Sequence, residues 1–86
     1  MVYVYVLKSK KDSGLYIGFT SDLKKRFKEH NSGYSKSTKS RIPFKLIYYE
    51  SFINISDTRA REIYLKSGYG RKQLGDILKN TINENL

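Results

Sequence analysis

The stretch "GLYIGFTSDLKKRFKEH", residues 14–30, passes from strand spacing to helix spacing without a proline. Residues 15–19 form a short apolar run that predicts a strand. Residues 20–22, Thr-Ser-Asp, supply the hydroxyl and carboxylate groups that cap helices. Apolar and functional residues then recur at i, i+3, i+4 and i+7. They are Leu23, Arg26, Phe27 and His30. The stretch therefore predicts a strand followed by a helix that packs on the sheet, with Gly33 suited to its C-terminal cap.

The strand at 15–19 has a partner just before it. Residues 2–9, "VYVYVLKS", alternate with period two, so Tyr3, Tyr5 and Leu7 share the face opposite to the valines. Residues 10–14, "KKDSG", have the composition of a turn. The two strands therefore read as an antiparallel hairpin.

A third strand is predicted at residues 44–51, "FKLIYYES". Its nearly continuous apolar run is typical of a strand covered on both faces, so we expect it at the centre of the sheet. Residues 34–43, "YSKSTKSRIP", are polar, basic and rich in serine, which predicts an exposed, mobile loop.

Two helices are predicted after the third strand. The first spans residues 56–67, and its sheet-facing stripe is expected to hold Ala60, Ile63, Tyr64 and Ser67. "GYG" at 68–70 then breaks the chain, and a short helix at 71–80 packs through Leu74, Ile77 and Leu78. We expect one domain over residues 1–80 and a frayed tail over 81–86.

Composition narrows the function classes. The 86-residue chain has no cysteine and one histidine, which excludes disulfides, thiolate metal sites and His-rich zinc sites. No run approaches the roughly 18 apolar residues of a spanning helix, and the N-terminus lacks the order of a signal peptide. We expect a soluble, cytoplasmic protein that does not contact membranes.

The net charge of +9 is unevenly distributed. Residues 1–49 hold eleven Lys or Arg against three Asp or Glu, a charge of +8, whereas residues 50–86 carry +1. Clustered positive charge fits a polyphosphate partner, because neutralised phosphates release counterions. Solubility alone is the other explanation of this charge.

Three motifs follow one another in the order of a known family. "VYV" at 4–6 lies on the first strand, "YIG" at 16–18 lies on the second, and "LKKRFKEH" follows as a helix. In this order and spacing the chain resembles the GIY-YIG endonuclease domain from Val4 to about Lys72. It is most similar to stand-alone bacterial GIY-YIG proteins related to the nuclease domain of the excision-repair incision subunit. The resemblance implies an α+β fold, a small three-stranded antiparallel sheet flanked by helices.

The resemblance also implies a set of site residues. Tyr5 matches the first-motif tyrosine, with Tyr3 as the alternative, and Glu62 matches the metal-binding glutamate. The remaining matches are Tyr16, Gly18, Arg26 and His30. The implied reaction is phosphodiester hydrolysis, in which a tyrosine positions or deprotonates water and an arginine grips the phosphate. Glu62 would hold Mg²⁺ or Mn²⁺ on the leaving oxygen, or it would only form helical ion pairs with Arg59 or Lys66.

The expected partner is DNA, with RNA as the alternative and repair proteins as further partners. Cleavage should show little sequence preference, because so short a chain has no separate targeting domain. Four cations are expected on the nucleic acid: Lys24, Lys36, Lys39 and Arg41. The family's asparagine after the metal glutamate is absent, with Gln73 the nearest amide. A non-catalytic nucleic-acid-binding module, or an interaction domain for a repair protein, is therefore kept as an alternative to the nuclease.

Overall fold

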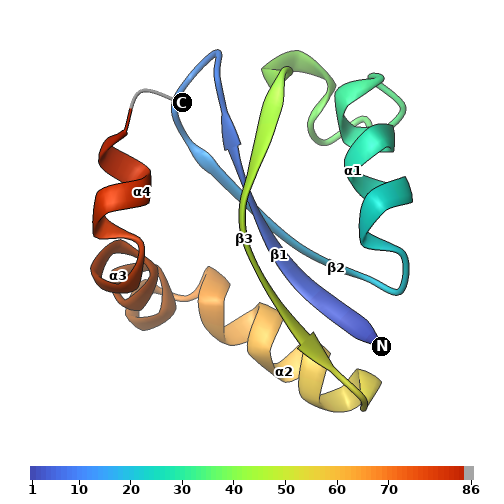
Figure 1. The fold of residues 1–86 in the computed structure, drawn as a ribbon, viewed down its shortest axis with the longest axis vertical. Coiled ribbons are helices and arrows are strands. Elements are labelled where there is room, and N and C mark those ends of the chain that lie inside the picture. The colour runs from blue at the N-terminus through green and yellow to red at the C-terminus, as the bar shows by residue number, and fades with distance from the viewer. Residues whose placement is uncertain (85–86) are drawn as a thin grey trace.

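The computed structural model describes residues 1–84 and contains one three-stranded antiparallel sheet with helices on both faces (Figure 1). The strands are β1 (Val2–Ser9), β2 (Leu15–Thr20) and β3 (Phe44–Phe52). The helices are α1 (Leu23–Asn31), α2 (Ile55–Lys66), α3 (Gly68–Ile77) and α4 (Lys79–Asn83), with a short 3₁₀ turn at Lys39–Arg41. The predicted α+β class with its antiparallel sheet is confirmed.

The β1–β2 hairpin forms as predicted and sets the register of the sheet. Tyr5 lies opposite Gly18, and Leu7 lies opposite Tyr16. The connecting turn is closed by the Gly14 N–H, which donates to the Asp12 carboxylate at 2.8 Å. This register brings the tyrosines of the first two motifs to one face of the sheet, because paired residues share a face.

The central strand is β1, and the prediction that residues 44–51 would be central is wrong. The strand order is β2-β1-β3, so β3 is an edge. Val4 to Leu7 are all buried, whereas Lys45 and Tyr49 of β3 are exposed. Because the side chains of β1 alternate between the two faces of the sheet, the strand contributes buried residues to both faces. Tyr5 is buried as fully as the valines. An apolar run containing tyrosines is compatible with an edge strand, because a tyrosine has a polar end: Tyr49 is exposed, and the Tyr48 hydroxyl donates to Glu50 at 2.6 Å.

Each face of the sheet has its own core. The face under α2, α3 and α4 buries Val4, Val6, Ile17, Leu65, Leu74 and Leu78. The opposite face buries Tyr5, Leu7 and Phe44, with Leu23 and Phe27 of α1 packed against them. Helix α1 starts as predicted, with the Asp22 carboxylate accepting the Lys25 N–H at 3.1 Å. Helix α1 therefore lies directly over the tyrosine face (Figure 1).

Helix α2 buries a different stripe from the predicted one. The buried residues are Thr58, Glu62 and Leu65, whereas Ala60, Ile63 and Tyr64 are exposed. The Thr58 hydroxyl donates to the Asn54 carbonyl at 2.9 Å, and the Glu62 carboxylate is ion-paired. The apolar pattern misplaced the face because two of the three buried residues are polar groups with satisfied partners.

The segment "GYG" starts a helix instead of only ending one. The Ser67 hydroxyl caps α3 by accepting the Gly70 N–H at 3.2 Å. A Cβ at position 70 would collide with the backbone of Tyr64 and Leu65, so glycine lets α3 begin against the end of α2. The third helix thus begins at residue 68, not 71, and ends at Ile77, which is half exposed.

The chain continues past residue 80 in regular structure. Helix α4 extends to Asn83, and Ile82 packs against the core of the α2 face. Residues 85 and 86 of the predicted frayed tail lie outside the described residues. Within residues 1–84, none of the helices has the length and apolar character needed to span a bilayer.

The serine-rich segment 34–43 is only partly the exposed loop predicted for it. Lys36 and Lys39 are exposed, but Thr38 is completely buried. The Ser9 hydroxyl donates to the Arg41 carbonyl at 2.6 Å, which ties the segment to the end of β1. The segment therefore delivers a hydroxyl into the interior, beneath α1.

Candidate active site

Tyr5 forms the centre of a polar cluster between the sheet and α1. The residue is 2% exposed, and its hydroxyl lies 2.8 Å from Nε2 of His30. A Cβ at position 18 would lie 2.5 Å from the Tyr5 hydroxyl oxygen, so the ring fills the space left by Gly18. The sequence predicts that Gly18 lets backbone or substrate approach closely. In the structure the Tyr5 ring occupies this space instead.

His30 connects Tyr5 to the buried hydroxyl of Thr38. The imidazole is fully buried, with Nδ1 2.8 Å from Thr38 Oγ1. Burial lowers the pKa of His30 to about 4, and the positive charge of Arg26 adds to the effect. The imidazole is therefore neutral at neutral pH, with a proton on one nitrogen and a lone pair on the other.

The direction of these hydrogen bonds follows from the neighbours at both ends. Burial raises the pKa of Tyr5 to about 12, although the adjacent Arg26 guanidinium opposes the shift. Tyr5 is thus a protonated phenol whose oxygen faces a cation. The Thr38 hydroxyl donates to the Ser35 carbonyl at 3.5 Å. We therefore assign Tyr5 O–H as the donor to Nε2, and Nδ1–H as the donor to Thr38.

Arg26 lies beside this chain of hydrogen bonds. Its guanidinium donates to the Glu29 carboxylate at 3.1 Å and to the Ser35 hydroxyl at 3.4 Å. The side chain retains 30% of its exposure, so it is oriented but still open to solvent. A guanidinium held in this way is suited to bind a phosphate through two N–H groups.

Tyr16 packs against the same imidazole. Its ring lies 4.9 Å from the His30 ring in an edge-on arrangement and 6.4 Å from the Tyr5 ring. Tyr16 is only half-buried, and within residues 1–84 its hydroxyl makes no hydrogen bond to the protein. The cluster therefore holds one buried phenol and one phenol that solvent or substrate can reach.

Glu62 approaches from the other helix layer. It is 7% exposed, and its Oε2 accepts from Lys66 Nζ at 2.8 Å while Oε1 lies 4.0 Å from Arg59 Nε. Its negative charge contributes to the raised pKa of Tyr5, which places it within electrostatic range of the cluster. The helical ion pairs considered as the alternative explanation of Glu62 are therefore present.

Glu62 is the residue near the cluster that could hold a divalent metal. In the described part of the chain there is no group of three or more His, Asp or Glu side chains that could together hold a metal ion. Mg²⁺ needs fewer, because it binds through one or two carboxylates plus water and substrate phosphates. Glu62 supplies one buried carboxylate near Tyr5, and Lys66 is the cation that now neutralises it.

The structure brings together five of the predicted site residues around one point: Tyr5, Tyr16, Gly18, Arg26 and His30. The alternative first-motif residue, Tyr3, lies elsewhere and contacts Tyr49 with ring centroids 6.0 Å apart. Gln73 lies outside the cluster, where it accepts from Arg61 at 3.2 Å. The first-motif tyrosine of the cluster is therefore Tyr5.

The predicted nucleic-acid contacts divide into two kinds. Lys24, Lys36 and Lys39 are exposed. Arg41 is held by Asp12 at 2.7 Å and lies 5.5 Å from the centre of the Phe44 ring. Its guanidinium thus has a structural role in the hairpin turn in addition to any role at the surface.

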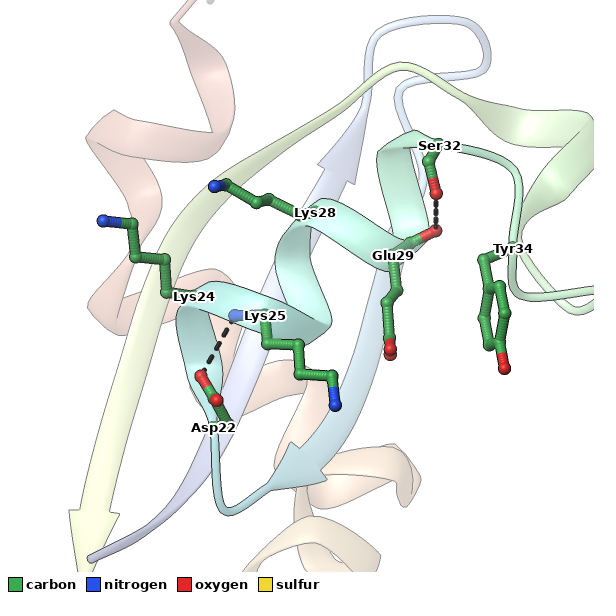
Figure 2. Close-up of a pocket in the computed structure, with 7 residues that line it drawn as sticks. All are labelled: Asp22, Lys24, Lys25, Lys28, Glu29, Ser32 and Tyr34. Carbon is green, nitrogen blue, oxygen red and sulfur yellow. Dashed lines mark hydrogen bonds between the residues drawn. The ribbon is translucent and has the colours of Figure 1, made fainter.

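The outer flank of α1 carries a shallow groove lined by three lysines together with Asp22, Glu29, Ser32 and Tyr34 (Figure 2). Lys24 and Lys28 project to one side of the helix, and Lys25 projects to the other, where Glu29 and Tyr34 lie (Figure 2). Within residues 1–84 none of the three lysines forms an ion pair. Their charge is therefore available to a polyanion next to Arg26.

Sequence reasoning missed the residues that hold the cluster in place. Thr38 orients His30, while Glu29 and Ser35 orient Arg26. Thr38 and Ser35 belong to a segment without periodicity, so nothing in its pattern distinguishes a buried hydroxyl from an exposed one. Glu29 was detectable, because it follows Arg26 at i+3 on a predicted helix.

Comparison with known proteins agrees with these features. A family model described as the GIY-YIG catalytic domain matches residues 1–74. UPF0213 protein CPE1444 of Clostridium perfringens is 44% identical over 85 residues, covering 98% of this chain and 90% of the relative. UPF0213 protein YsiG of Lactococcus lactis is 40% identical over 81 residues, covering 93% and 77%.

A solved structure has a similar fold. The solution NMR structure of UPF0213 protein BH0048 from Bacillus halodurans is 34% identical and superposes with a TM-score of 0.56. The similarity covers 90% of this chain and 85% of that one. The motif order, the clustered tyrosines and these matches lead to one conclusion: the chain belongs to the GIY-YIG catalytic domain family.

Proposed function

We propose that this protein is a metal-dependent endonuclease that hydrolyses phosphodiester bonds in DNA with little sequence preference. The observation that carries the proposal is the hydrogen-bonded chain Tyr5–His30–Thr38 beside the open guanidinium of Arg26. A fold needs no such buried relay for packing alone, because buried polar groups cost stability unless they are satisfied. The membership of the GIY-YIG catalytic domain family supports the same reaction class.

The residues of the chain divide the reaction between them. Arg26 binds the scissile phosphate and offsets charge on its oxygens. Tyr5 is buried in the free protein, so substrate binding must admit the attacking water to its oxygen. As this water attacks phosphorus, its proton passes to the Tyr5 oxygen and the Tyr5 proton passes to His30 Nε2. The P–O bond to the leaving oxygen breaks and that oxygen takes a proton from solvent, while His30 returns its extra proton to solvent through Tyr5, which restores the resting site. Tyr16, which solvent can reach, hydrogen-bonds the same water.

Substrate binding also prepares His30 for its role. The charge of Arg26 is one cause of the lowered His30 pKa. A bound phosphate neutralises this charge, so the imidazole becomes a better proton acceptor in the complex than in the free protein. When present, Mg²⁺ supplies positive charge for the phosphate and leaving oxygen, and Glu62 is the residue that would hold it.

The Lys66–Glu62 ion pair and the position of Gln73 favour a second candidate, a non-catalytic DNA-binding module. A cleavage assay separates the two. Labelled duplex, nicked, flapped and single-stranded DNA is incubated with Mg²⁺, with Mn²⁺ or with EDTA. A nuclease cleaves at least one substrate only with the metal, whereas a binding module retains DNA in every condition and cleaves none.

Two variants test whether the cleavage comes from this site. Glu62→Gln should keep DNA affinity while cleavage falls by orders of magnitude, because the ion acts as the bond breaks. Arg26→Ala should lower both affinity and rate, because the guanidinium grips the phosphate before and during reaction. If folded Glu62→Gln protein cleaved as fast as the parent, Glu62 would be only an ion-pair residue. Lys72→Gln, a substitution of an exposed α3 residue, is the matched control.

A further inference from the structure

A second groove lies between α1 and the edge strand β3. Tyr3 and Tyr49 of the sheet and Leu23, Phe27 and Lys24 of α1 contribute to its lining. It lies on the tyrosine face of the sheet, since Tyr49 is paired with Tyr5 across the β1–β3 ladder. The candidate active site lies toward β2 and this groove lies toward β3, so the two flank α1 on opposite sides.

The two tyrosines of this groove, Tyr3 and Tyr49, belong to neither core. Tyr49 is 53% exposed, and its ring meets Tyr3 at 6.0 Å between centroids and at an interplanar angle of 67°. Leu23 and Phe27 form an apolar wall beside them. An exposed aromatic ring with an apolar wall offers a surface on which a flat ring can stack.

The rim of the groove is cationic. Lys24 lines it and, within residues 1–84, has no ion-pair partner. Asp22 also lines it, but its carboxylate is already engaged as the α1 cap by the Lys25 N–H. A ligand that fits must therefore combine a flat apolar part with an anionic part, and a nucleotide has both.

We propose that this groove binds an unpaired base of the DNA substrate, with Lys24 on the adjacent phosphate. The proposal rests on the proposed nuclease function and specifies its substrate as DNA with a single-stranded segment near the cut. The base must be unpaired, because a base within a duplex already stacks on its neighbours and cannot lie on Tyr49.

Binding measured without metal tests this inference apart from cleavage. Fluorescence anisotropy in EDTA follows a labelled oligothymidine strand and a fully paired hairpin with the parent protein and three variants. Tyr49→Leu removes the aromatic ring but keeps an apolar side chain, and Tyr49→Phe keeps the ring. Tyr69→Leu is the matched control, because Tyr69 is an exposed tyrosine of α3 in the opposite layer.

The expected result is selective. Tyr49→Leu should weaken binding of the single strand about fivefold or more, because base–aromatic stacking is sequence-tolerant and strong. It should leave hairpin affinity unchanged, and Tyr49→Phe and Tyr69→Leu should bind both probes like the parent. Thermal unfolding of each variant establishes that the fold is retained.

Three results would overturn the proposal. They are single-strand affinity of Tyr49→Leu equal to that of the parent, an equal loss for both probes, and no binding of the single strand by the parent. If the parent binds the single strand through Tyr49 but cleaves no DNA with Mg²⁺ or Mn²⁺, the proposal for the groove stands and the proposed nuclease function is rejected. The two failures are therefore distinguishable.

Discussion

The ring of Tyr5 occupies the space in which a side chain at Gly18 would stand, since a Cβ there would lie 2.5 Å from the phenol oxygen and 2.6 Å from Cζ. Tyr5 and Gly18 are paired residues of neighbouring strands, so the contact follows from the register of the hairpin. The glycine of "YIG" is therefore needed to let the first-motif tyrosine reach His30. One residue type on β2 thus determines the position of a functional group on β1.

Gly18→Ala should accordingly destabilise the protein and disrupt the cluster. The added methyl group must displace a buried ring, and overpacking of this kind costs about 1–3 kcal/mol. Gly75→Ala is the matched control, because its Cβ would meet nothing within 4 Å and it lies within α3. It should stabilise the protein by up to about 1 kcal/mol. Urea unfolding of both variants measures the difference, and equal stabilities would contradict this account of Gly18.

Thr38 should act as a positioning residue for His30. Thr38→Val keeps the shape but removes the hydroxyl, leaving the buried Nδ1–H without its acceptor at a cost of about 1–3 kcal/mol. Thr38→Ser restores the hydroxyl and should retain parental behaviour. Because His30 is the sole histidine of the sequence, ¹⁵N NMR of the imidazole reports its tautomer directly. An unchanged tautomer in Thr38→Val would remove Thr38 from the relay.

The lowered pKa of His30 makes stability depend on pH. Burial lowers the pKa of His30 to about 4 in the folded protein, against 6.5 for a solvent-exposed imidazole, so the unfolded chain binds the proton first as pH falls. Stability from the neutral imidazole is fully present above pH 6.5 and is lost between 6.5 and about 4. The loss is about 3 kcal/mol.

A variant isolates this contribution. His30→Asn cannot take up the proton, so the difference in unfolding free energy between parent and variant should be largest above pH 6.5 and shrink toward pH 4. Urea unfolding across this range measures the difference, and NMR titration of His30 gives the pKa itself. A constant difference, or a pKa near 6.5, would show that the imidazole is not held neutral by burial.

Sequence reasoning succeeded where side-chain pattern and burial agree. Alternation in residues 2–9 gave the two faces of β1, and the Asp22 cap with Leu23 and Phe27 gave the start and orientation of α1. Motif spacing then identified Tyr5 and Tyr16, which the hairpin register brings to one face, and His30, which α1 brings against both of them. Local patterns therefore sufficed for the hairpin and helix that carry most of the cluster.

It failed where burial is decided by tertiary partners. The apolar run of β3 suggested a central strand, but strand order depends on pairings between distant residues. Glu62 is buried because it lies on the inner side of α2 and pairs with Lys66. A search for apolar residues at helical spacing does not detect a buried carboxylate. Thr38 is buried because residues 34–43 fold back beneath α1, and no local signal in that segment encodes the contact.

The exposed lysines of residues 34–43 should set the salt dependence of DNA binding. Lys36 and Lys39 are exposed, and each phosphate contact contributes about 0.9 to the slope of log affinity against log salt concentration on duplex DNA. Replacing both with alanine should therefore lower the slope by up to about 1.8 without changing the fold. Duplexes of unrelated sequence should respond alike, because phosphate contacts carry no sequence information.

Arg41→Ala is the informative comparison in the same segment. Its guanidinium is held by Asp12 at 2.7 Å and 3.2 Å, and this pairing lowers the pKa of Asp12 to about 2. Replacing Arg41 with alanine removes one cation, so net charge falls by one, and it leaves the Asp12 carboxylate of the hairpin turn without its partner. We expect a smaller change in salt slope than for either lysine, together with a lower melting temperature. Fluorescence anisotropy at several salt concentrations and thermal unfolding measure the two effects. A slope change equal to that of Lys36→Ala, with unchanged melting, would show that Arg41 leaves Asp12 to bind phosphate.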